Sequence, residues 1–205
     1  MLVDIRRLTV EEYHRLGEMG IIDPDEKVEL IEGQIIKKPV KGTPHSAAVA
    51  RTDNLLRNRL GERVLVRLQD PVRLDDYSEP EPDIAVVMPD PLYYEDHHPT
   101  PGEVYLFIEV AVSGACRVLQ DKSVWKTPKD TTLRSDRELK AKVYAKSGIA
   151  DCWVLDVNNR QLYVFREPSH QGYQSQVILE DEGIISPLAF PKVAIAVSAM
   201  LAPKR

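Results

Sequence analysis

The sequence has few of the features that mark secreted or membrane-spanning proteins. It has only two cysteines in 205 residues, Cys116 and Cys152, and they lie far apart without the spacing of metal ligands. Such sparse cysteine fits a reducing cytoplasm in which both thiols stay reduced. No apolar run reaches the roughly 20 residues that a membrane helix needs, and the N-terminus lacks the apolar core and cleavage site of a secretory signal. We therefore expect a cytoplasmic protein that does not interact with a membrane.

Positive charge is also in short supply. The chain has 27 Lys and Arg against 32 Asp and Glu, a net charge of -5. Proteins that bind nucleic acid are usually basic, so the average charge counts against general DNA binding and leaves room only for a local basic face. The remaining composition, 43% hydrophobic and 29% charged, is that of an ordinary globular protein,. The length suits one domain with a sizeable core.

Two apolar segments that each carry one acidic residue stand out in the middle of the chain. Asp83 opens the β-branched run 84–87 after two prolines, and Glu109 lies inside the apolar run 104–110. Both runs predict strands that are buried on both faces. A carboxylate in such a strand needs a partner, a bound cation or a raised pKa, because desolvating it alone is very costly. Two such carboxylates on adjacent strands suggest a site for a divalent metal ion.

Helical and strand patterns surround these two segments. Capping boxes, apolar spacing and terminal glycines predict helices at 9–19, 45–60 and 135–148,. Turn residues between apolar runs predict β-hairpins at 28–36 and 152–165,. Since strands outnumber helices and helices occur on either side of the acidic strands, we expect an α/β or α+β domain with a mixed sheet.

The acidic strands and one lysine could together carry out phosphodiester hydrolysis. This reaction needs carboxylates that hold Mg²⁺, a group that orients the water, and a cation that offsets charge on the phosphate. Asp83 and Glu109 are hard oxygen ligands of the kind that Mg²⁺ prefers, and the backbone carbonyl after Glu109 is a candidate third ligand,. Lys140 comes early in the helix that follows, from which it could reach the ends of the strands.

Several short motifs occur in an order that resembles a known family. They are, in chain order, 28–35 (VELIEGQI), 82–87 (PDIAVV), 108–110 (IEV), 136–140 (DRELK), 144–149 (YAKSGI) and 152–156 (CWVLD). Each motif alone is weak, but the ordered set is specific and covers nearly the whole chain from about Thr9. The set resembles the Uma-two family of bacterial restriction-endonuclease-like proteins, within the PD-(D/E)xK nuclease superfamily.

The resemblance implies roles for four residues. Asp83 and Glu109 would be metal ligands, and Glu29 would be an auxiliary acid near the metal. Lys140 would be the catalytic lysine, moved from the strand to the following helix, since position 111 is Ala where the strict motif has Lys. The resemblance also implies a restriction-endonuclease-like central mixed β-sheet flanked by helices with extra β-hairpins. It further implies dependence on Mg²⁺, with Mn²⁺ as an alternative ion, DNA as the substrate, and frequent homodimers.

One segment departs from the family pattern. Residues 112–129 intervene between the strand of Glu109 and the helix of Lys140, where the family passes quickly from one to the other. We therefore predict a single domain over 1–205 with an insertion at about 112–129. A loop of this length has to be tethered, disordered or functional. We expect it to loop out at the surface and to leave Glu109 and Lys140 in place.

Simpler explanations exist for each candidate residue. Asp83 could accept backbone hydrogen bonds at the start of its strand, and Glu109 could form an ion pair with Lys140 or Arg137. Glu29 could lie on the surface of its hairpin. Lys140 alone resembles a solvated helix lysine.

Two further residues and three functions complete the expectations. His45, after Pro44 at a helix start, is expected to cap the helix or to be exposed, and Tyr144 is expected in the core. The leading function is a Mg²⁺-dependent DNA endonuclease. The alternatives are a catalytically silent nuclease-fold module that binds nucleic acid or a protein, and an enzyme of other metal-dependent phosphoester chemistry.

Overall fold

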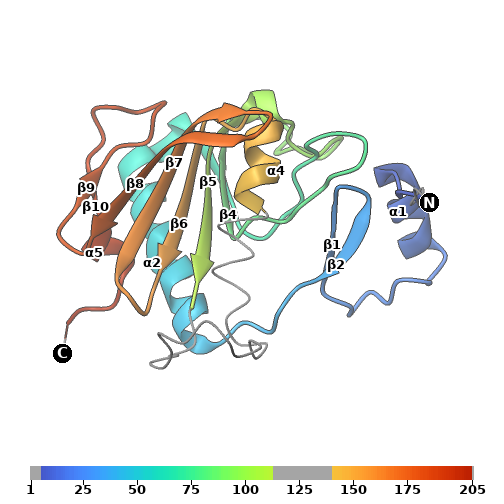
Figure 1. The fold of residues 1–205 in the computed structure, drawn as a ribbon, viewed down its shortest axis with the longest axis horizontal. Coiled ribbons are helices and arrows are strands. Elements are labelled where there is room, and N and C mark those ends of the chain that lie inside the picture. The colour runs from blue at the N-terminus through green and yellow to red at the C-terminus, as the bar shows by residue number, and fades with distance from the viewer. Residues whose placement is uncertain (1–5, 113–139, 205) are drawn as a thin grey trace.

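The computed structural model describes residues 6–112 and 140–204, and a six-stranded mixed β-sheet forms its centre (Figure 1). The strand order is β3-β4-β5-β6-β7-β8, and β5 and β6 are the one parallel pair in this sheet. The strands are β3 (Leu65–Arg67), β4 (Ile84–Val87), β5 (Val104–Ala111), β6 (Asp151–Asp156), β7 (Gln161–Ser169) and β8 (Gly172–Glu180). The predicted mixed sheet is confirmed.

The two acid-bearing strands are buried on both faces, as their composition predicts. Successive side chains of a strand point to opposite faces. On β5, Ile108 and Val110 belong to one hydrophobic cluster, whereas Phe107 and Ala111 belong to the other. Every residue of β4 is buried too. Both faces of the sheet therefore need a covering layer.

Helices cover the two faces of the sheet. On one face lie α2 (Thr43–Leu60) and the short α5 (Val197–Met200), whose buried residues share the cluster of Ile108. On the other face lies α4 (Ala141–Lys146), whose Val143 and Tyr144 pack in the cluster of Phe107 (Figure 1). Glu109 points to the α4 side, because it alternates with Ile108 along the strand.

The N-terminal elements lie to the right of the main sheet in Figure 1, beyond the side on which β4 is labelled. The predicted capping box of Thr9 and Glu12 is present, with Oγ1 of Thr9 accepting from the Glu12 amide at 3.2 Å, and α1 (Val10–Glu18) follows. The strands β1 (Val28–Ile31) and β2 (Gln34–Lys37) form the predicted antiparallel hairpin. Its turn residues Glu32 and Gly33 have φ of 48° and 77°, the positive values of a tight hairpin turn,.

The remaining elements are short. They are the 3-10 helices η1 (Gly61–Arg63) and η2 (Pro101–Glu103), and the paired strands β9 (Ile184–Ile185) and β10 (Ile195–Ala196). The helix predicted at 135–148 is described only from its later part, since its capping box lies outside the described residues. All of the predicted insertion beyond Val112 lies outside them as well. No helix within the described ranges is long and apolar enough to cross a membrane.

Candidate active site

The antiparallel pairing of β4 and β5 brings the two predicted metal ligands together. Ile84 pairs with Ile108, so the next step of the register places Asp83 opposite Glu109. The Asp83 amide donates to Oε2 of Glu109 at 3.4 Å, and the Val110 amide donates to Oδ2 of Asp83 at 2.9 Å. Both carboxylates are buried. They therefore form one acidic site at the end of two adjacent central strands.

Two basic side chains, Lys41 and His45, contact the Asp83 carboxylate from the other side. Nζ of Lys41 lies 3.0 Å from Oδ1, and Nε2 of His45 lies 2.9 Å from Oδ2. Burial alone would raise the pKa of Asp83, but the contacts with His45, Lys41 and the Val110 amide outweigh it and hold this pKa well below its usual range,. Asp83 is therefore ionised throughout the physiological range of pH.

The prediction that His45 caps its helix or is exposed is wrong. Its side chain is buried, and α2 has no side-chain cap. Nδ1 of His45 is also buried and has no hydrogen-bond partner within the described part of the chain. Lys41 lies just before α2 and His45 in its first turn, four residues later, and this spacing was the available signal that both side chains could reach one site.

Lys140, at the N-cap of α4, and Tyr144 within this helix contact the Glu109 carboxylate. Nζ of Lys140 lies 3.2 Å from Oε1 of Glu109, and the Tyr144 hydroxyl donates to the same oxygen at 2.6 Å. Lys140 and Tyr144 are four residues apart and so share one side of the helix. Burial raises the pKa of Glu109; Lys140 opposes this rise, whereas the nearby carboxylates of Asp83 and Glu29 add to it,. Tyr144 is in the core as expected, but its contact with Glu109 was not foreseen.

Glu29 joins the same cluster through Lys140. Its Oε1 lies 3.1 Å from Nζ of Lys140, and its Oε2 accepts from the Glu81 amide at 3.0 Å. Glu29 is only 3% exposed and Lys140 only 7% exposed, so the surface alternatives for both residues are wrong. The ion pair between Glu109 and Lys140, the simpler alternative for Glu109, is present and stands beside the ligand interpretation.

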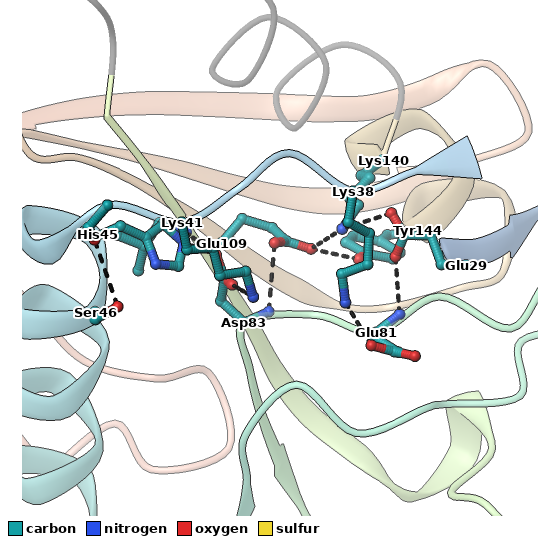
Figure 2. A network of polar contacts seen from close by, with 12 residues as sticks. Glu29, Lys38, Lys41, His45, Ser46, Glu81, Asp83, Glu109, Lys140 and Tyr144 are labelled. Atoms are coloured by element: carbon teal, nitrogen blue, oxygen red, sulfur yellow. Dashed lines mark hydrogen bonds and ion pairs between the residues drawn. The ribbon is translucent and has the colours of Figure 1, made fainter. Parts of the chain in front are cut away.

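One cavity of about 380 Å³ is lined by the acidic and basic members of this cluster, namely Glu29, Lys41, His45, Asp83, Glu109 and Lys140. Figure 2 shows Glu109 between two groups of side chains, with Asp83, Lys41 and His45 on one side and Lys140 and Tyr144 on the other. The end of β2 and the connection from β2 to α2, residues 38–42, form a further part of the lining. The sequence identified Asp83, Glu109, Lys140 and Glu29 as candidate site residues. It did not predict that this lysine-rich connection lines the same cavity.

The donor set fits Mg²⁺ better than a metal that needs a full protein cage. Among residues 6–112 and 140–204, no three His, Cys, Asp or Glu side chains are grouped so as to hold a metal ion. Mg²⁺ keeps several waters and usually takes only one or two carboxylates from the protein. Asp83 and Glu109 supply two, and Val110, whose carbonyl follows Glu109, lines the same cavity.

A mixed sheet with adjacent carboxylates at one end of its strands, and a lysine of a neighbouring helix beside them, defines a restriction-endonuclease-like fold. A crystal structure of a "putative nuclease belonging to DUF820" from Anabaena variabilis ATCC 29413 is similar, with a TM-score of 0.65 and 18% identity over 94% of this chain and 97% of that chain. The chain belongs to the Uma2 family, described as "Putative restriction endonuclease", whose model matches residues 10–198. No curated protein gives a significant match.

Proposed function

We propose that this protein is a Mg²⁺-dependent endonuclease that hydrolyses phosphodiester bonds in DNA. The observation that carries the proposal is the meeting of Asp83, Glu109 and Lys140 at one cavity, with Nζ of Lys140 3.2 Å from Glu109. Membership of the Uma2 family supports the same reaction.

Asp83 and Glu109 are the proposed metal ligands. Asp83 is held ionised by its neighbours, and Glu109 is held in position by the Tyr144 hydroxyl. A bound Mg²⁺ would supply Lewis-acid stabilisation of the phosphate and a water of lowered pKa. The same oxygen ligands would accept Mn²⁺, which prefers similar donors.

Lys140 is the proposed catalytic lysine. Its ammonium group lies between two buried carboxylates, Glu109 and Glu29, which fix its position. A cation held in advance beside the metal ligands can stabilise the negative charge that develops on the phosphate without reorganising during the reaction. Glu29 acts as a positioning residue for Lys140, and the Glu81 amide in turn fixes Glu29.

A plasmid-nicking assay with added Mg²⁺ tests the proposal. Wild type is expected to convert supercoiled plasmid to the nicked form, and chelation of the ion should stop the reaction. Asp83→Ala should remove the activity, whereas Asp25→Ala, at an exposed loop position, should retain it. Equal nicking by wild type and Asp83→Ala would reject this site.

A homodimer, proposed from the family resemblance, is tested separately by sedimentation of the same preparation.

A further inference from the structure

The connection between β2 and α2 places two lysines on the wall of the cavity. Lys38 pairs with Glu81 at 2.5 Å, and Lys41 pairs with Asp83 at 3.0 Å. We call these two residues the lysine wall. Figure 2 shows both side chains reaching from this connection toward the acidic residues. The wall therefore brings positive charge to a site that also has to admit a metal ion and a phosphate.

The hydrogen-bonding capacity of Asp83 is largely occupied. Oδ1 faces Lys41, and Oδ2 faces both His45 and the Val110 amide. The ammonium group of Lys41 lies 3.0 Å from Oδ1 and would repel a divalent ion bound to that oxygen, so metal binding favours the departure of a neighbouring cation,.

Lys41 is the neighbour best able to move away. The Val110 amide is fixed in β5, and His45 is held by the rigid first turn of α2 with only 11% of its side chain exposed. The side chain of Lys41 is 25% exposed and precedes the helix. A lysine also has a long flexible stem that lets its ammonium swing between anions.

We propose that Lys41 leaves Asp83 when a divalent ion binds and then holds a phosphate oxygen of the DNA. The inference rests on the proposed function, because it takes Asp83 as a metal ligand. It assigns to Lys41 a role distinct from that of Lys140, which stays between Glu29 and Glu109.

The charges around the cavity support this exchange. Three buried carboxylates, Glu29, Asp83 and Glu109, face the ammonium groups of Lys41 and Lys140. A divalent ion added to this set leaves surplus positive charge, which a phosphate group would neutralise. The first turn of α2 has neither an acidic residue nor a side-chain cap, so the positive end of this 18-residue helix also favours an anion near Lys41,.

Two titrations of Lys41→Met test the inference. With Mg²⁺ alone, calorimetry should show about tenfold tighter binding than wild type, because the ion no longer has to displace an ammonium group. With a short DNA duplex in Ca²⁺, binding should weaken by about tenfold and the salt dependence should fall by about one phosphate contact. If Lys41 had a merely structural role, its replacement would weaken the binding of both Mg²⁺ and DNA.

Lys27→Met is the control, since Lys27 is exposed and lies outside the lining of the cavity. Its Mg²⁺ affinity should equal that of wild type. Lys41→Gln serves as a second neutral variant, compared only after its melting curve shows a folded protein. Unchanged or weaker Mg²⁺ binding by both neutral variants would overturn the role of Lys41. Failure of wild type itself to bind Mg²⁺ would instead overturn the proposed function.

Discussion

Nζ of Lys140 lies 3.2 Å from Oε1 of Glu109, although 31 residues separate the two in the chain. The contact joins the start of α4 to the interior of β5, across the edge of the proposed cavity. Lys140 is thus close enough to the carboxylates to serve as the lysine of the nuclease motif, even though the strand itself carries Ala111 at the usual place.

Replacement of Lys140 by Met should distinguish the effect of its charge on catalysis from the effect of its side-chain volume. The variant keeps most of the apolar stem but loses the cation between Glu29 and Glu109. Loss of a preorganised charge typically slows catalysis roughly 100- to 1,000-fold, and we expect that loss in Mg²⁺-dependent nicking. The exposed Lys142→Met on the same helix is the control and should nick like wild type. Full activity of Lys140→Met would show that another group stabilises the phosphate.

The hydroxyl of Tyr144 should stabilise the fold through Glu109. Tyr144→Phe keeps the ring against Phe107, at 4.7 Å between centroids, and removes only the bond of 2.6 Å to the carboxylate. Hydrogen bonds to charged groups contribute about 1.5–3 kcal/mol, so urea denaturation should show a loss of that size. Tyr94→Phe, whose hydroxyl donates to the neutral backbone carbonyl of Met88 at 3.0 Å, should lose less,. Equal losses in the two variants would contradict a special role for Glu109.

Metal affinity should rise with pH. Burial raises the pKa of Glu109, and a metal ion binds only the ionised carboxylate, so binding has to release a proton wherever Glu109 is still protonated,. Mg²⁺ affinity should therefore increase as the pH rises through this raised pKa and level off above it. Calorimetry in buffers of different ionisation enthalpy measures the released proton. Glu109→Gln should bind weakly at every pH, and a pH dependence that survives in it would point to another group.

The β1–β2 turn should be sensitive to a single methyl group at Gly33. Its φ is +77°, and a Cβ there would lie 2.4 Å from Cβ of Arg7 and 3.0 Å from its Cα. Gly33→Ala should therefore lower the free energy of unfolding by about 1–3 kcal/mol. Gly20 has a similar φ of +69° with open space around it, so Gly20→Ala carries the backbone strain alone. If Gly33→Ala and Gly20→Ala have the same melting temperature, the contact with Arg7 does not contribute to the loss of stability.

Local patterns were sufficient to predict the elements that hold the carboxylates. The β-branched run after Asp83 and the apolar run around Glu109 have no exposed face, and both became buried central strands. The capping box of Thr9 and the turn at Gly33 could also be predicted from the sequence, because each depends on residues that are neighbours in the chain.

Contacts between elements that are distant in the chain could not be predicted from local sequence patterns. Lys41 and His45 meet Asp83 only because α2 packs against the sheet, and nothing in their own neighbourhood specifies that packing. His45 followed a proline at a helix start, which favoured exposure, and its burial is a tertiary effect. The spacing of four residues between Lys41 and His45 indicates that both side chains point in a similar direction, but it does not predict that they contact Asp83.

The parallel pairing of β5 with β6 also bears on how this family can diversify. Parallel neighbours cannot be joined by a tight turn, so the chain between Ala111 and Asp151 has to return along the sheet by a crossover, to which α4 belongs,. Doubling the length of such a connection costs only about 0.6 kcal/mol of closure entropy. The carboxyl end of β5 is therefore a tolerant place for evolution to add sequence while the register of β4, β5 and β6 keeps the acidic residues where they are.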